Sequence, residues 1–160
     1  MSSRKRYRPK GVNVQSWVVA MQGACLLSEE DQRIRVEPIR HSVELIAQGK
    51  GGKEEWQGVF DALNMIEEFS RMPKVMRNAR DYIESTQGVI VGILDRQKAS
   101  QTKALYPSEL ADLRSMVDLW AELLTTVTHH EYFKAEENTH RRLKAILASK
   151  TPGVRIVEAA

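Results

Sequence analysis

The sequence predicts an all-α protein, an irregular helical bundle of four to six helices with a flexible basic N-terminal arm. Apolar residues recur every three or four positions through most of the chain, as on the buried face of a helix. Proline and glycine fall between these stretches, where helices begin and end. The chain has 160 residues, 42% hydrophobic and 28% charged, which is the composition of one globular domain. We expect a disordered arm over residues 1–11, a helical domain over residues 12–150 and a loose tail over residues 151–160.

The basic charge of the chain lies in the arm. The first ten residues contain five cations and no acid, so they carry +5, whereas the whole chain carries +3 and the rest therefore sums to −2. Like charges at this density repel one another, and few apolar groups offset the entropy lost on ordering. The cations are Arg4, Lys5, Arg6, Arg8 and Lys10, with Tyr7 among them.

The segment after the arm, residues 12–27, is short and rich in valine. Asn13 is placed to cap a helix that begins at residue 14 and stops near Gly23. A strand is the alternative, because a Val-rich run this short fits both structures. The next helix is predicted from Ser28, whose side chain is placed to bond the backbone of Asp31 three residues later.

Pro38 interrupts this next helix. It either kinks a single helix or separates two pieces, the second of which ends near residue 48. Three glycines between residues 49 and 52 then break the chain. Residues 53–72 follow with a continuous apolar stripe, which predicts a long helix, and Pro73 ends it.

Residues 74–98 also show helical spacing, although Gly88 and Gly92 interrupt it. The middle of this segment alone would fit a strand, but the flanking periodicity runs through it in phase, so we predict a helix. Two glycines four residues apart lie on one face of a helix, where another helix can approach closely.

The last two predicted helices have the clearest signals. Pro107 and Ser108 open a helix with an apolar stripe from Leu110 to Val127. Thr128 and Glu131 form a capping box, so another helix is predicted to begin at residue 129 and to end before residue 152. Its expected inward residues are Tyr132, Ala135, Thr139, Leu143, Ile146 and Leu147.

No pattern of residues predicts a catalytic, metal or cofactor site, and we expect none of these. Cys25 is the single cysteine and lies in an apolar run, where a buried structural thiol is expected. Glu137 and His140 are spaced like half of a di-metal bundle site, but the second such pair is missing. Neighbouring acids such as Glu67 and Glu68 point about 100° apart on a helix, so we interpret them as solvated faces.

The basic residues are the better candidates for a binding role. The arm combines its five cations with Tyr7, and such a segment can neutralise phosphates and stack on a base. A solubilising terminus is the alternative. Arg141, Arg142 and Lys144 form a second candidate contact cluster, although Glu136 and Glu137 one turn earlier can pair with it. Sequence-specific DNA reading is not expected, because no convincing helix-turn-helix is present.

The longest apolar stretches are shorter than the roughly 20 residues that cross a membrane. No apolar run of signal-peptide length follows the basic start either. We therefore expect a cytoplasmic protein that does not insert into a membrane.

Residues 4–10, read as Arg-Lys-Arg-Tyr-Arg-Pro-Lys before a helical body, resemble the start of small proteins encoded by bacteriophages and prophages. Leu63-Asn64-Met65 with the acids after it adds to this resemblance. The resemblance implies no catalytic residue. It implies a location in the host cell cytoplasm and a role as a stoichiometric inhibitor or adaptor of host machinery, including nucleic-acid-handling defence systems.

The expected function is therefore non-enzymatic binding of a protein partner, in the form of an anti-CRISPR-like inhibitor of host defence or nucleic-acid machinery. The alternative is a nucleic-acid-binding regulator that uses the arm. A homo-oligomer is compatible with both, through the Gly88 and Gly92 face or the stripe over residues 110–127.

Overall fold

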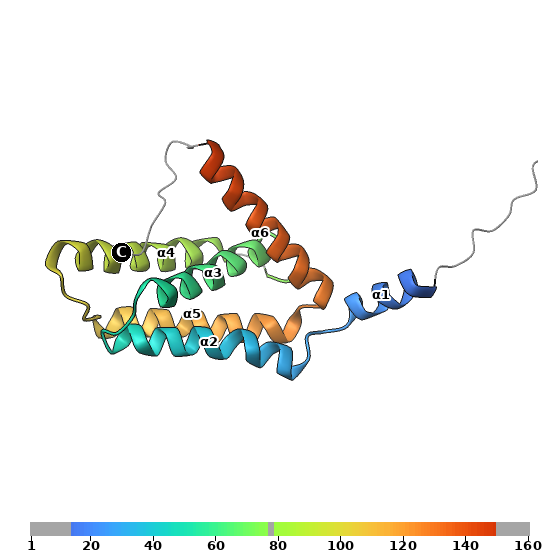
Figure 1. Cartoon of the computed structure of the whole chain (residues 1–160), viewed down its shortest axis with the longest axis horizontal. Coiled ribbons are helices and arrows are strands. Elements are labelled where there is room, and N and C mark those ends of the chain that lie inside the picture. Colours follow the sequence, from blue (N-terminus) through green and yellow to red (C-terminus); the bar gives the residue numbers. More distant parts are fainter. Residues whose placement is uncertain (1–13, 77–78, 150–160) are drawn as a thin grey trace, which may run out of the picture.

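The computed structural model describes residues 14–76 and 79–149, with side chains from residue 19 onward, and this part of the chain forms six helices (Figure 1). The predicted all-α bundle is therefore confirmed. The arm with Arg4 to Lys10, the predicted cap Asn13 and the tail over residues 151–160 lie outside the described residues. The helices are α1 (Val14–Ala24), α2 (Glu29–Ala47), α3 (Lys53–Ser70), α4 (Arg80–Ser100), α5 (Pro107–Thr126) and α6 (His129–Ser149).

Helices α2 to α5 form a four-helix bundle in which consecutive helices run antiparallel (Figure 1). Helix α2 packs on α3 and α5, α4 packs on the same two helices, and α3 meets α5 across the diagonal. Short connections favour this up-and-down order. The side chains that fill the centre are apolar and fully buried, and the largest include Phe69, Ile46, Ile66, Ile90, Ile93, Leu113, Met116 and Leu124.

Helix α2 begins with a side-chain cap and stays continuous through Pro38. The backbone N–H of Asp31 donates to Ser28 Oγ over 3.1 Å, as the sequence predicts. Of the two interpretations of Pro38, the single helix is confirmed, because the proline lies inside α2. The proline cannot donate to the carbonyl of Ile34. Beside that carbonyl, Trp120 Nε1 donates to the carbonyl of Arg35 over 3.1 Å, which ties α2 to α5 at this point.

The turn between α2 and α3 requires glycine at one position. A Cβ atom at Gly51 would collide with the side chain and backbone of Ile46, which occupies the space beside it. The chain therefore passes closely over the end of α2 before α3 begins. Glu55 caps the first turn of α3, because its carboxylate accepts a hydrogen bond from the backbone N–H of Gly52 over 2.7 Å.

Helix α4 is continuous through both of its glycines, so a helix there is confirmed, but it begins at Arg80 and not at residue 74 as predicted. Gly88 and Gly92 are exposed, and a Cβ atom at either would meet nothing within 4 Å. Among the described residues, no helix approaches this face closely.

Helices α1 and α6 lie outside the four-helix bundle. Helix α6 packs on α3, and among the helices α1 contacts α6 alone and points away from the body (Figure 1). The helical alternative for residues 12–27 is confirmed in α1, and the strand is wrong. The capping box of Thr128 and Glu131 is also confirmed, because Glu131 N–H donates to Thr128 Oγ1 over 3.2 Å and Thr128 N–H donates to Glu131 Oε2 over 2.8 Å.

The connection between α1 and α2 is fixed to the start of α6 by backbone hydrogen bonds. Leu27 N–H donates to the carbonyl of Val127 over 3.3 Å, and His129 N–H donates to the carbonyl of Cys25 over 2.9 Å. Cys25 is exposed, so the prediction of a buried thiol is wrong. Of the apolar run around it, Leu26 is exposed and only Leu27 reaches the core, because the run forms this connection and not a helix.

Helix α6 corrects a second prediction. Of its six expected inward residues only Ala135 is buried, while Leu143 and Leu147 are 38% and 62% exposed. The physical reason is that α6 meets the bundle mainly through α3, and its C-terminal half rises beyond the bundle (Figure 1). Helical spacing predicts an apolar face, but it does not say that another helix covers that face.

Candidate protein-binding groove

A groove of about 440 Å³ lies where α2, α3 and α6 meet. Its apolar residues come from these three helices and, through Trp120, from α5, and most of its polar residues are on α6. The apolar residues are Ile34, Pro38, Ile39, Ala62, Met65, Trp120 and Leu143, and the polar ones are Arg35, Asp61, Tyr132, Glu136, Thr139 and His140.

The groove exists because α6 follows α3 and not α2. The backbones of α2 and α6 do not come into contact, and only side chains at the start of α6 bridge the gap. Ile34 stays 53% exposed at its edge, off the buried stripe of α2 that Val36, Val43 and Ile46 form. With two exposed apolar side chains, Ile34 and Leu143, in its lining, the groove is a surface that favours an apolar partner.

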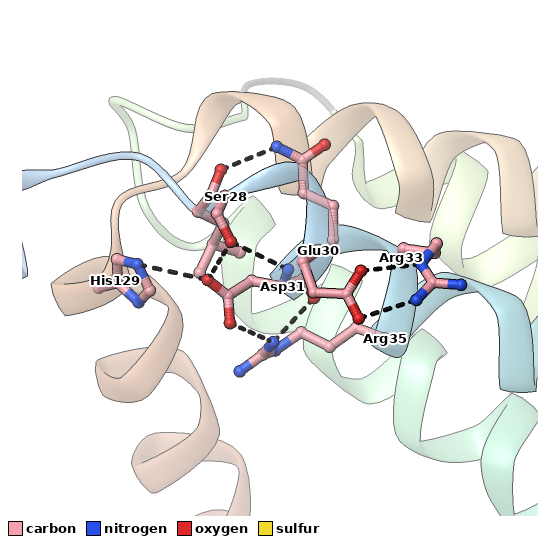
Figure 2. Close-up of polar contacts among 8 residues, drawn as sticks. Ser28, Glu30, Asp31, Arg33, Arg35 and His129 are labelled. Atoms are coloured by element: carbon pink, nitrogen blue, oxygen red, sulfur yellow. Dashed lines mark hydrogen bonds and ion pairs between the residues drawn. The ribbon is translucent and has the colours of Figure 1, made fainter.

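A polar cluster around Asp31 lies at the start of α2 and shares Arg35 with the groove lining (Figure 2). Ser28 Oγ donates to Asp31 Oδ2 over 2.5 Å, Arg35 Nη1 donates to the Asp31 carbonyl over 2.8 Å, and His129 Nε2 lies 3.7 Å from Asp31 Oδ2. The hydrogen bond from Ser28, helped by Arg35 and His129, holds the pKa of Asp31 below its usual value. The serine bonds to the carboxylate and not to the imidazole, so this is a helix cap and lacks the order of a catalytic triad.

Aromatic rings beside Arg35 form part of the groove wall. The Arg35 guanidinium lies 4.6 Å from the centre of the Tyr132 ring, and the Trp120 and Tyr132 rings are 6.5 Å apart. Burial raises the pKa of Tyr132, although Arg35 opposes this shift. The hydroxyl therefore stays neutral, and the wall offers a fixed aromatic surface at the base of the groove.

Helix α6 is held in place by a buried ion pair behind the groove. Glu68 on α3 is only 5% exposed, and it accepts from Arg142 and, over 3.0 Å, from Asn138 Nδ2. Arg142 also lies 3.7 Å from Glu67. The prediction that Glu67 and Glu68 form a solvated face is thus wrong for Glu68, because α6 crosses α3 directly above it.

The structure separates the predicted cluster of Arg141, Arg142 and Lys144. Arg142 points to the bundle and is engaged by Glu68. Arg141 and Lys144 are exposed on the outer face of α6, and Arg141 Nη2 donates to Glu137 Oε1 over 2.9 Å, the pairing that the sequence offered as the alternative. The other predicted contact residues, those of the arm, lie outside the described residues.

The Glu137 and His140 pair does not gain further ligands from the fold. Within residues 14–76 and 79–149, no three His, Cys, Asp or Glu residues come together in a way that could hold a metal ion. Glu137 pairs with Arg141, and His140 stands on the rim of the groove.

The six described helices include none with the length and apolarity needed to span a membrane. Comparison with known proteins returns no family model, no curated protein and no solved structure that matches this chain.

The groove itself was missed by sequence reasoning. Apolar residues that remain exposed could have indicated it. They are Ile34, which lies outside the buried stripe of its own helix, and Leu143 and Leu147 on α6. Those two leucines were assigned to the core because they continue the apolar spacing of α6, and only the position of α6 relative to α2 shows that they are uncovered.

Proposed function

We propose that this protein works by binding a protein partner in the groove between α2, α3 and α6, and not by catalysis. The observation that supports this most directly is the partly exposed apolar lining of the groove, with Ile34 and Leu143 at its edges. An apolar surface bordered by polar groups is typical of a site that receives an amphipathic helix. Because the Tyr132 and Trp120 rings are already packed in place, the groove loses little side-chain entropy when a partner binds.

We further propose that the partner belongs to host defence or nucleic-acid machinery, so that the protein is a phage-type, anti-CRISPR-like inhibitor in the host cytoplasm. This part of the proposal is supported by the resemblance of residues 4–10 to phage-encoded proteins. The proposal is consistent with the exposed apolar lining of the groove and with a chain small enough to act as a stoichiometric inhibitor.

The binding step is tested by capture from a bacterial lysate with three forms of the full chain. Ile34→Arg places a charge at the edge of the groove, where the side chain is exposed and the fold should survive. Ser115→Arg, on an exposed position of α5 outside the groove, is the matched control. We expect the natural chain and Ser115→Arg to capture the same partner in stoichiometric amount and Ile34→Arg to lose it. Equal capture by all three forms, or no partner for the natural chain, contradicts the proposal.

The inhibitory role is tested in cells that restrict a phage through an active defence system. Expression of the natural chain should raise the number of plaques, and Ile34→Arg should not. An unchanged plaque count across several such systems argues against inhibition of defence, while leaving partner capture as a separate result.

The second candidate is a nucleic-acid-binding regulator that uses the basic arm, supported by its charge of +5. Deletion of residues 1–10 should abolish binding to nucleic acid, and the affinity of the full chain should fall steeply with salt because each phosphate contact releases counterions. Absence of binding at low salt excludes this function.

A further inference from the structure

Helix α1 is mostly exposed over residues 19–24, the part whose side chains the structure describes. It contains no charged residue, and its described apolar side chains Val19 and Met21 are 67% and 53% exposed. It has 11 residues, and an isolated helix of fewer than about 12 residues is marginal in water. Among the described helices it touches only α6 (Figure 1). A stable α1 therefore needs a cover that its own chain, as described, does not supply.

The groove is a surface that lacks a helix. Its wall along α6 extends from Tyr132 to Leu143, which at 1.5 Å per residue is roughly 16 Å. Helix α1, from residue 14 to residue 24, is roughly 15 Å long by the same measure. The groove and α1 thus match in length and in apolar character.

We propose that the groove of each chain receives α1 of a second copy, in a two-fold symmetric dimer that exchanges its first helices. The proposal rests on the groove being a protein-binding surface, as proposed above, and names a second copy of this chain as its occupant when no host partner is bound. Reciprocal exchange uses both the uncovered helix and the groove of each copy, as closed two-fold symmetry requires.

The connection between α1 and α2 favours exchange over folding back. Its two backbone hydrogen bonds, from Leu27 to Val127 and from His129 to Cys25, direct α1 away from the body. Folding α1 onto its own groove would break them. Ile34 comes soon after this connection in the sequence. The C-terminal end of α1 and the Ile34 edge of the groove therefore lie at the same end of α2. A two-fold axis near that end would place α1 of each copy at the groove of the other copy.

Charge complementarity supports the same occupant. Asp61 and Glu136 stand on the rim of the groove, and neither forms an ion pair among the described residues. The segment that directly precedes α1 in the sequence carries +5 over residues 1–10. A second copy therefore brings an uncharged apolar helix, preceded in the sequence by a cationic segment, to a groove whose lining carries Asp61 and Glu136 besides Arg35 and His140.

The test is the mass of the full chain in solution, measured by sedimentation from low to high micromolar concentration. The natural chain and the control Ser115→Arg should be dimers. Ile34→Arg, which blocks the groove, and Val19→Asp, which places a charge on α1, should each weaken the dimer at least about tenfold, or about 1.4 kcal/mol. Both positions are more than half exposed, so the monomer should fold, and circular dichroism checks this.

Mixing the two variants is the decisive experiment. The Val19→Asp chain retains a natural groove and the Ile34→Arg chain retains a natural α1, while their altered parts carry opposite charges. The mixture should therefore form a heterodimer at concentrations at which each variant alone is largely monomeric.

Three results would overturn the exchange. One is a natural chain that stays monomeric at all concentrations, and another is a dimer that neither variant weakens. The third is a mixture of the two variants that stays monomeric. Loss of lysate capture by Ile34→Arg with an unchanged dimer would refute the exchange and leave the proposed function standing.

Discussion

Arg141 and Arg142 are neighbours in the sequence with opposite surroundings. Arg142 is held by the buried Glu68, whereas Arg141 and its partner Glu137 are 69% and 72% exposed. Removal of one member of a buried pair leaves an uncompensated charge, and an exposed pair contributes little.

We therefore expect Arg142→Ala to lower the free energy of unfolding by about 3–5 kcal/mol. Arg141→Ala should change it little, and it is the matched control. Urea unfolding measures both. A similar small effect for the two variants would mean that α6 is not held by Glu68. The double variant Glu68→Leu with Arg142→Met should recover much of the loss, because it removes both buried charges together.

Glu109 makes the stability of the molecule depend on pH. Arg96 donates to its carboxylate, with Nη2 2.7 Å from Oε2, and the backbone N–H of Tyr106 donates to the same oxygen over 2.7 Å. The hydrogen bond from Arg96 holds the pKa of Glu109 below its usual value. A lowered pKa in the folded state means that the pairing stabilises the fold above the unfolded pKa of about 4.3 and is lost as the pH falls.

We expect Glu109→Gln to be less stable than the natural chain at neutral pH and the difference to shrink as the pH falls below about 4. Urea unfolding at several pH values measures this difference. Glu122→Gln, at an exposed site of α5, removes a carboxylate that forms no ion pair among the described residues, and its effect on stability should not change with pH in this way. A difference that stays constant down to pH 3 would contradict an ionic role for Glu109.

At the scale of the helices, α4 carries two glycines that its packing does not require. Neither Gly88 nor Gly92 has a neighbour within 4 Å of the position of a Cβ atom. Glycine in a helix interior costs about 0.5–1 kcal/mol relative to alanine.

Gly88→Ala and Gly92→Ala should each therefore raise the free energy of unfolding by about 0.5–1 kcal/mol, measured by urea unfolding. If the glycine face instead serves close contact between copies, both substitutions should reduce the mass of the particle in sedimentation. The two outcomes distinguish glycines that the helix merely tolerates from glycines that form an interface between copies. The sequence alone left both interpretations open.

The helices were largely predictable because their signals are local. The cap at Ser28, the box of Thr128 and Glu131 and the stripe of α5 each depend on residues within a few turns. The groove and the buried Glu68 were not predictable in this way. Both follow from where α6 crosses α3, and apolar spacing says nothing about which face of a helix remains uncovered after the last helix has packed.

At the scale of the whole molecule, helix α1 leaves the body at the end of the bundle where α2 and α6 begin (Figure 1). Val19 and Ile34 are exposed, whereas the four-helix bundle buries its apolar residues within itself. Changes at Ile34 and Val19 are therefore expected to alter association, while changes in the bundle core alter folding.

The up-and-down order of α2 to α5 has a consequence for the rate at which the chain reaches its native state. Three of the four lateral contacts of this bundle join helices that are consecutive along the sequence, and the contact of α2 with α5 closes it. Low contact order of this kind is associated with folding in microseconds to milliseconds. Because joining α2 to α5 closes the longest loop, we expect substitutions at that contact to change the refolding rate less than substitutions between α2 and α3.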